Sequence, residues 1–279
     1  MKEIFMRFPG GLAKALTFSY DDAVWEDIRL TAIFKQHRLK ATFNINSGLH
    51  APEGTVQQPG QVGGQMPLSV ALQTYDDPLF EVAAHSVDHP FLDTTPSAVA
   101  YGQIVYDRRN LEREFGRSIY GFAYPMGTYS EAVVEMCRAA GIHYARTVTP
   151  THSFDLPTEW LTLHPTCHHA DPQLTELGER FAAAVYGRHP QMFYVWGHAY
   201  EFHRDDNWQI IEAFAEKMAG REDIWYATND EIYCYCRAYS RLRFSADGLI
   251  VYNPTATDLW YAFENGPSAV IRAGETVRL

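Results

Sequence analysis

The chain has 279 residues, of which 46% are hydrophobic and 20% are charged. These fractions are typical of globular proteins and exclude disordered, collagen-like and fibrous classes, while the length suits either two small domains or one α/β barrel with an appendage. The formal net charge of −11 argues against nucleic acid or an anionic membrane as the main partner, so we expect neither.

The cysteines and the amino-terminal residues indicate in which cellular compartment the protein works. Four cysteines are too few and too scattered for a disulfide framework, so we expect reduced thiols at Cys137, Cys167, Cys234 and Cys236. The amino end carries no signal-peptide pattern, and no stretch approaches the roughly 18 apolar residues of a membrane span. These features predict a cytoplasmic location.

The first half of the chain predicts alternating strands and helices, because strand-like apolar runs alternate with apolar residues at helical spacing. In chain order we expect a strand over 13–19, a helix over 25–36, strands over 40–45 and 79–84, a helix over 97–115 capped by Ser97, and a strand over 121–124. The polar stretch 50–67 is long for a connection, which is typical of a lid or binding loop.

The second half continues this alternation and then changes character. We expect helices over 131–140, 174–186 and 208–218, and strands over 143–146, 191–196 and 224–227. Repeated strand–helix units predict a largely parallel sheet that is closed or nearly closed into a barrel, within residues 1–239. Residues 240–279 predict a small β appendage without catalytic groups, with strands over 241–244, 249–252, 259–263, 269–272 and 276–279.

Polar clusters stand directly after several predicted strands, where the functional loops of a parallel barrel lie. They are Asp21-Asp22, His85-Ser86-Val87-Asp88-His89, Pro125-Met126-Gly127 and Gly197-His198. Two histidines four residues apart share one face of a helical turn, so we expect His85 and His89 to direct both imidazoles at one divalent metal ion. One carboxylate of the Asp21-Asp22 pair then serves as the third ligand and the other is left as a base. Three protein ligands leave a coordination position open, as in catalytic sites.

Four segments resemble, in order and spacing, the motifs of the NodB-type polysaccharide deacetylases, the family 4 carbohydrate esterases. They are residues 17–22 (TFSYDD), 85–89 (HSVDH), 122–127 (FAYPMG) and 196–198 (WGH), within a match over about 10–235. The resemblance implies a distorted (β/α) barrel of the NodB-homology type and one divalent metal ion, most often Zn²⁺, with Co²⁺, Ni²⁺ or Fe²⁺ as alternatives. It implies metal ligands at Asp22, His85 and His89, a general base at Asp21 and a general acid at His198.

The chain departs from the family pattern at two positions. Ala23 follows the acidic pair where the family commonly has Gly, and Ala123 stands in the third motif where the family often has an Arg that steadies the base. Arg146, after a neighbouring predicted strand, is a candidate to replace that arginine.

Further candidates surround this core. The substrate-binding candidates are Tyr124, whose neighbourhood offers a backbone N–H to an oxyanion site, and Pro125, Trp160 and Trp196. Glu201, His168 and His169 are candidates to support the catalytic residues from behind, together with Arg146.

We therefore expect a metal-dependent hydrolase that removes N- or O-linked acetyl groups from an acetylated carbohydrate. One alternative is a hydrolase of another amide, similar to the allantoinase-like relatives of this superfamily, which generally lack the metal triad. The other is a catalytically inactive carbohydrate-binding protein, which would need neither the base nor the acid.

Overall fold

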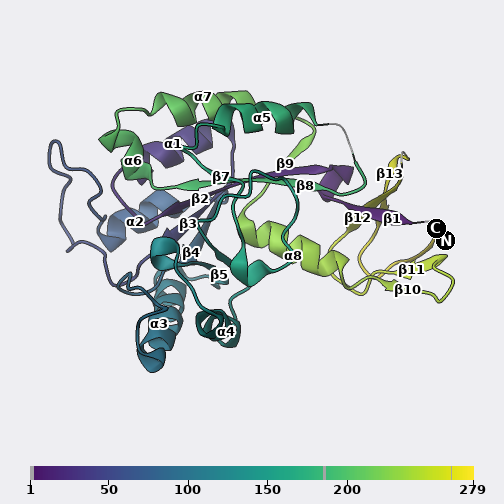
Figure 1. Ribbon diagram of the computed structural model, residues 1–279, viewed down its shortest axis with the longest axis horizontal. Coiled ribbons are helices and arrows are strands. Elements are labelled where there is room, and N and C mark those ends of the chain that lie inside the picture. Colours follow the sequence, from purple (N-terminus) through teal and green to yellow (C-terminus); the bar gives the residue numbers. More distant parts are fainter. Residues whose placement is uncertain (1–2, 185–186, 265) are drawn as a thin grey trace.

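A curved, parallel sheet runs through the centre of the protein in a computed structural model that describes residues 3–184, 187–264 and 266–279 (Figure 1). Its strand order is β6-β5-β4-β3-β2-β8-β7, and β9 pairs with the start of β2. The strands are β2 (Lys14–Asp21), β3 (Ala41–Ile45), β4 (Phe80–Ala84), β5 (Gly121–Ala123), β6 (Tyr144–Arg146), β7 (Cys167–His168), β8 (Gln191–Gly197) and β9 (Ile224–Tyr226). The sheet is the curled half-barrel of the predicted distorted (β/α) barrel, so this prediction is confirmed.

One stretch of chain hydrogen-bonds to two strands that lie far apart in this sheet, β6 and β8. Leu163 donates its N–H to Ala145 O of β6 (2.9 Å), and Thr166 donates to Tyr194 O of β8 (2.9 Å). The connection holds β6 near β8, although the two strands lie far apart in the strand order. Arg146 at the end of β6 therefore comes within reach of β2 and β8.

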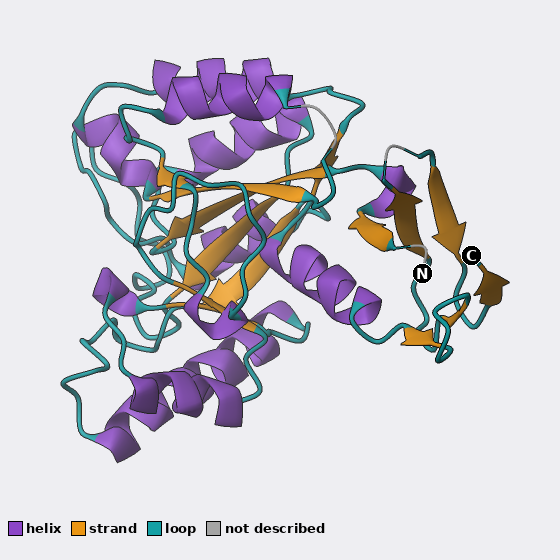
Figure 2. Ribbon diagram, turned by 45° about the vertical axis from the view of Figure 1, so that its right-hand side comes forward, coloured by secondary structure: helices purple, strands orange, loops and turns teal. Residues whose placement is uncertain are grey.

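Helices cover the outside of the sheet (Figures 1 and 2). They are α1 (Asp27–His37), α2 (Leu68–Tyr75), α3 (Ser97–Phe115), α4 (Glu131–Ala139), α5 (Leu174–Ala183), α6 (Ala199–Arg204), α7 (Gln209–Met218) and α8 (Asn229–Tyr239). Three 3-10 helices are η1 (Pro9–Gly11), η2 (Pro125–Gly127) and η3 (Trp160–Thr162). Helices α1, α5, α6 and α7 gather on one side, and α3 and α4 lie together on another (Figure 1).

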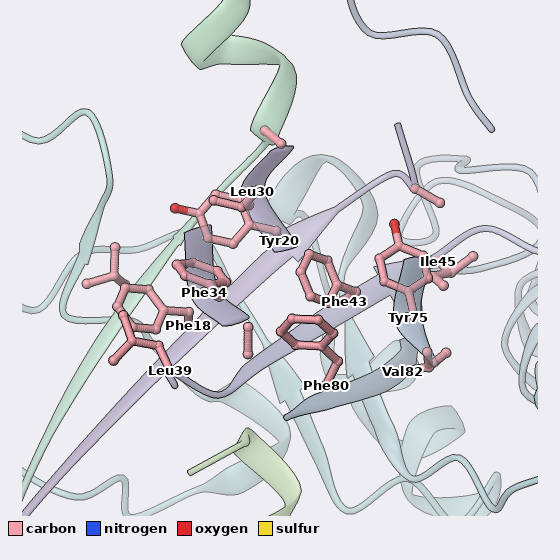
Figure 3. Close-up of a cluster of buried hydrophobic side chains, with 14 of the residues drawn as sticks. Phe18, Tyr20, Leu30, Phe34, Leu39, Phe43, Ile45, Tyr75, Phe80 and Val82 are labelled. Atoms are coloured by element: carbon pink, nitrogen blue, oxygen red, sulfur yellow. The ribbon is translucent and has the colours of Figure 1, made fainter. Parts of the chain in front are cut away.

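An aromatic cluster supports the central strands from behind (Figure 3). Phe18 of β2 packs on Phe34 of α1 with ring centroids 4.8 Å apart, and Phe43 of β3 packs on Tyr75 of α2 at 4.7 Å. Every residue of β2 is buried, as expected for a central parallel strand with both faces covered. This packing fixes the position of Asp21, the last residue of β2.

The carboxyl-terminal residues form two small antiparallel sheets beside the barrel (Figure 2). One contains β10 (Arg243–Phe244), β11 (Ile250–Tyr252) and β14 (Thr276–Arg278), and the other contains β12 (Leu259–Phe263), β13 (Ser268–Ile271) and β1 (Ile4–Arg7). Strand β1 comes from the opposite end of the chain and pairs with β12 from Ile4↔Phe263 to Arg7↔Trp260. The appendage thus includes a strand from the segment that the sequence analysis assigns to the barrel.

Several elements differ from the sequence-based expectations. Helix α5 ends at Ala183, and residues 185–186 of the predicted helix lie outside the described residues. Pro96, not Ser97, occupies the N-cap of α3. Three helices were not predicted, namely α2, α6 and α8. Helix α8 nevertheless begins with a capping box of Thr228 and Glu231, a signal that the sequence does contain.

Within the described ranges, no helix is both long enough and apolar enough to cross a membrane.

Candidate active site and metal centre

The acidic pair lies where β2 ends and the chain turns sharply. Asp21 is the last residue of the strand and is 2% exposed, while the side chain of Asp22 is 19% exposed. Asp22 and Ala23 both have left-handed backbone, with φ of 81° and 52°. Such conformations are uncommon for residues other than glycine, and they often occur at functional sites. The turn brings both carboxylates to the same place, since Asp21 Oδ2 and Asp22 Oδ1 lie 3.9 and 3.8 Å from His85 Nε2.

The histidine pair reaches the same point from the loop after β4. The expectation of a helical turn is wrong: residues 85–89 are irregular, and Ser86 and His89 have φ of 67° and 56°. The loop is held by the N–H of His89, which donates to Ser86 Oγ (3.1 Å). The outcome for the side chains is still the expected one, because His85 Nε2 and His89 Nε2 lie 3.0 Å apart.

Asp22, His85 and His89 form a set of ligands that suits a divalent metal ion. Asp22 Oδ1 lies 3.8 Å from the Nε2 atoms of both histidines. Tetrahedral zinc bonds of about 2.1 Å would separate neighbouring ligand atoms by roughly 3.4 Å, so these spacings fit with small adjustments. His85 Nδ1 hydrogen-bonds to Ala123 O (2.8 Å), which leaves the lone pair on Nε2 facing the cluster.

Asp21 is held behind these ligands by Arg146 and Asn44. The Arg146 guanidinium makes a buried ion pair with Asp21 Oδ2, and Asn44 Nδ2 donates to Oδ1 (2.8 Å). Burial favours the neutral carboxyl, yet the charges of Arg146, His85 and His198 and the Asn44 hydrogen bond lower the pKa of Asp21 to about 2. Arg146 thus makes the contact that Ala123 cannot, as the sequence analysis suggested.

Trp196 supports this arginine. The Arg146 guanidinium stacks over the Trp196 ring at 4.3 Å from its centroid, and both residues are buried. The stacking fixes the plane of the guanidinium. Trp196, predicted to bind substrate, is therefore placed where it positions Arg146.

His198 follows β8 and faces the acidic pair across the mouth. Its Nε2 lies 3.7 Å from Asp21 Oδ2 and 4.0 Å from Asp22 Oδ2, and its Nδ1 lies 3.4 Å from Glu201 Oε2. Burial lowers the pKa of His198, but the hydrogen bond to Glu201 and the charges of both aspartates outweigh it and raise the pKa.

Glu201 gathers three imidazoles around one carboxylate oxygen. Besides His198, Oε2 lies 3.0 Å from His168 Nε2 and 3.3 Å from His169 Nε2. Burial of Glu201 favours protonation, yet the hydrogen bonds and charges of His168 and His198 lower the pKa of the carboxyl strongly, so it stays ionised. The Cys167-His168-His169 segment is thereby connected to the site through Glu201.

Three other predicted substrate-binding residues lie apart from the ligand cluster. The Tyr124 side chain is buried with its hydroxyl donating to Leu161 O (2.7 Å), and its N–H donates to Arg146 O (3.0 Å), so this N–H does not serve an oxyanion site. Pro125 is buried in η2. Trp160 packs edge-on against Tyr233 of α8, with ring centroids 5.3 Å apart.

Two further residues, Asp107 and Asn46, support the loop that carries the histidines. Asp107 of α3 accepts hydrogen bonds from the N–H of His85 and of Ser47 (2.8 Å each), and burial raises the pKa of its carboxyl to about 7. Asn46 Nδ2 donates to Ser86 O (2.9 Å). Asp107 shares the buried face of α3 with Ala100, Ile104 and Leu111, and a carboxylate in such an apolar stripe is a detectable signal.

Comparisons with known proteins find one matching family model. Residues 11–145 match the polysaccharide deacetylase family model, a stretch that includes the acidic pair and both histidines. A candidate polysaccharide deacetylase from Mycobacterium smegmatis is similar in structure, with a TM-score of 0.58 and 13% identity over 86% of this chain and 96% of that one. No curated protein sequence matches the chain significantly.

Two further solved structures are similar to the chain. A mutant, with restored enzymatic activity, of a CE4 family pseudoenzyme from Bacillus anthracis has a TM-score of 0.50 and 18% identity over 82% of this chain and 70% of that one. A Streptococcus pyogenes deacetylase, PplD, in complex with acetate has a TM-score of 0.46 and 18% identity, and the match covers 52% of this chain and 61% of that one. The chain thus matches the polysaccharide deacetylase family model over residues 11–145, just under half of its length, and it has the fold of the NodB-type polysaccharide deacetylases, the family 4 carbohydrate esterases.

Proposed function

We propose that the protein is a metal-dependent deacetylase that hydrolyses N- or O-linked acetyl groups of a carbohydrate. The observation that carries this proposal is the convergence of Asp21 and His198 on the ligand set of Asp22, His85 and His89, with His198 Nε2 3.7 Å from Asp21 Oδ2. A site that only binds sugar needs no paired base and acid beside three metal ligands. The proposed partner is an acetylated carbohydrate.

Asp22, His85 and His89 are the proposed metal ligands, and Zn²⁺ is the most suitable ion for one carboxylate and two imidazoles, with Co²⁺, Ni²⁺ or Fe²⁺ as alternatives. A divalent ion there supplies Lewis acidity, which makes water more acidic and polarises the acetyl carbonyl. The hydrogen bond of His85 Nδ1 to Ala123 O fixes the ring orientation for this role.

Asp21 is the proposed general base. Its low pKa, near 2, keeps the carboxylate ionised at neutral pH and able to accept a proton from the attacking water. The ion pair with Arg146 and the hydrogen bond from Asn44 hold the carboxylate in one orientation. Arg146 is a positioning residue, because it acts through Asp21.

His198 is the proposed general acid. It donates a proton from Nε2 to the departing amine or alkoxide, and its raised pKa favours the protonated form that this step needs. Glu201 contacts the other ring nitrogen, Nδ1, and so orients the imidazole. The two proton transfers then leave acetate and the free sugar amine or hydroxyl as products.

Exposed apolar side chains near the mouth suit a sugar ring. The loop after His89 and the loop after β5 contact each other through Thr128 Oγ1, which donates to Asp93 Oδ1 (2.8 Å). They expose Phe91 and Met126, which are 49% and 52% accessible, and Tyr129. Such groups pack against the apolar faces of pyranose rings while the polar site receives the acetyl group.

The test is acetate release from acetylated chitin oligomers, peptidoglycan fragments and acetylxylan, with metal analysis of the same sample. We expect release from at least one of the three by zinc-loaded protein, and its loss after chelation with recovery on adding zinc back. Folded, zinc-loaded protein that releases acetate from none of them would overturn the proposal and favour the inactive binding protein. Equal release by chelated protein would overturn the metal dependence.

A further inference from the structure

A second group of metal-ligand side chains lies at the opposite ends of the strands from the active site. His143 immediately precedes β6, whereas Arg146 ends that strand and points into the active site. Asp230 and Cys234 lie one turn apart near the start of α8 and face His143. This group is independent of the deacetylase residues, because no member contacts Asp21, Asp22 or the active-site histidines in the contacts of the described residues.

The donor atoms of this group are close together. His143 Nδ1 lies 2.8 Å from Asp230 Oδ1, and Cys234 Sγ lies 3.5 Å from Asp230 Oδ2. The three donor atoms lie within 4.8 Å of one another. The imidazole and the carboxylate are each 29% exposed, and Cys234 is exposed, so an ion can reach them from solvent.

The His143 ring is fixed before any ion arrives. It is stacked between Tyr120, with centroids 4.1 Å apart and planes 9° apart, and Tyr233, at 4.6 Å and 18°. Its backbone N–H donates to Tyr120 O (2.8 Å), and the N–H of Asp230 donates to Glu81 Oε2 (3.1 Å). Two of the three ligands therefore need little reorganisation, which lowers the entropic cost of binding.

The arrangement is unsuited to nucleophilic catalysis. A nucleophilic cysteine hydrogen-bonds to the imidazole that activates it. Here the Cys234 thiol donates to the Asp230 carboxylate, which lies between the thiol and the imidazole. Nitrogen, oxygen and sulfur donors at these spacings are instead the ligand types that zinc accepts in tetrahedral coordination.

We propose that His143 Nδ1, an oxygen of Asp230 and Cys234 Sγ form a second metal site that binds Zn²⁺, with water completing the coordination. On binding, the thiol releases its proton to solvent and the imidazole carries its remaining proton on Nε2. The bound ion ties the first turns of α8 to the start of β6. It stabilises the folded chain, because the unfolded chain does not hold the three ligands together.

Cobalt absorption tests this proposal without reference to activity. The probe is Co²⁺ added to the full-length His89→Ala protein, in which the active-site ligand set is broken. A thiolate ligand gives an intense near-ultraviolet sulfur-to-cobalt charge-transfer band, and the active-site ligand set of Asp22, His85 and His89 contains no thiol, so the band reports on cobalt bound outside that set. We expect the band with about one Co²⁺ per chain, and its loss on adding excess Zn²⁺.

Matched cysteine variants assign the band. Cys234→Ser, in the His89→Ala background, loses the band, whereas Cys236→Ser keeps it, because that thiol lies on another side of α8 and outside the group. Zn²⁺ also raises the unfolding temperature of the His89→Ala protein, and Cys234→Ser removes this rise.

Absence of the band in folded, reduced His89→Ala protein would overturn the proposal, as would a band that persists in Cys234→Ser. If Cys234→Ser does not fold, His143→Gln replaces it and is expected to weaken cobalt binding at least tenfold. Unchanged cobalt binding in that variant would also overturn the site.

Discussion

The two ends of the central strands carry ligand groups of similar composition but different construction. At the carboxyl ends, Asp22 and His89 stand on loops with left-handed backbone. At the amino ends, Asp230 and Cys234 stand on the regular helix α8, and His143 is clamped between two tyrosines. Strained loops appear where side chains must converge on a reacting centre, and regular elements suffice where an ion only joins two parts of the fold.

The proton-transfer groups differ as well. Asp21 and His198 lie beside the carboxyl-end ligands, each oriented by a further charged residue, Arg146 or Glu201. At the amino ends the imidazole and the carboxylate of the group, His143 and Asp230, are themselves proposed ligands. In the proposed mechanism, a base and an acid beside the ligands are what distinguish the active site from the second group.

The largest expected effect is the loss of the carboxyl-end ligand set in His89→Ala. We expect turnover to fall by about 10³-fold or more, because the metal contributes several kcal/mol of transition-state stabilisation. Metal analysis and acetate release measure the two losses together. His37→Ala, at the end of α1 and outside the ligand groups, should change neither, and full activity in His89→Ala would remove that residue from the site.

Asp21→Asn separates the base from the ligands. The variant keeps its metal, because Asp22 and the two histidines are intact, but kcat falls by about 10²- to 10³-fold through the loss of general base catalysis. Acetate release and metal content are measured on one preparation. Wild-type turnover by a metal-replete variant would refute the role of Asp21, and loss of metal would show that Asp21 is a ligand.

Arg146→Met tests the buried ion pair through stability. The variant leaves the Asp21 carboxylate buried without its partner, so the free energy of unfolding falls by about 3 kcal/mol in metal-free protein. The double variant with Asp21→Asn recovers part of this loss in a denaturant titration. Arg138→Met is the control, because its partner Glu135 is exposed and such pairs contribute little. Additive effects of the two buried substitutions would contradict a coupled pair.

Glu201→Gln sharpens the role of the residue behind His198. Glu201 raises the pKa of His198, although burial opposes it, and the histidine donates its proton only below that pKa. In Glu201→Gln the decline of kcat on the alkaline side of its pH profile therefore begins at lower pH, and kcat above neutral pH falls by about tenfold. Asp205→Asn, at the exposed end of α6, leaves the limb in place. An unmoved limb in Glu201→Gln would mean that the two residues are not coupled.

The smallest effect is expected for Ala23→Gly. Glycine relieves the backbone strain of the left-handed conformation at φ 52°, which stabilises the folded state by about 1 kcal/mol. It also raises the conformational entropy of the unfolded chain, which lowers the free energy of unfolding. We expect the free energy of unfolding to change by less than about 1 kcal/mol, as measured in urea. Ala100→Gly inside α3 raises the entropy of the unfolded chain but relieves no strain in the folded one, so it should lower the free energy of unfolding by about 1 kcal/mol. If Ala23→Gly lowers the free energy of unfolding as much as Ala100→Gly does, the backbone at position 23 is not strained.

Much of the barrel was predictable because its strands are short apolar runs after clear turn signals. The helix 97–115 and the five carboxyl-terminal strands match the sequence pattern closely. Strand β1 was not predictable, because its partner β12 is more than 250 residues away and the pairing is set by the tertiary fold.

The site was predictable to the extent that it follows strand ends and known motifs. The contact between Arg146 and Asp21 was only suggested, because it depends on the connection that brings β6 near β8. The roles of Trp196 beneath Arg146 and of Glu201 among three histidines depend on side-chain packing, and linear spacing carries no information about it. Trp160 shows the converse, since an aromatic residue near a motif packs on Tyr233 instead.

Anomalous diffraction at the zinc edge, from crystals of the zinc-loaded protein, tests the assignment of the catalytic metal most directly. We expect a strong peak for an ion ligated by Asp22 Oδ1, His85 Nε2 and His89 Nε2, with Asp21 outside the coordination sphere and paired with Arg146. A zinc ion ligated by Asp21, or no peak among these four residues in metal-replete crystals, would contradict it.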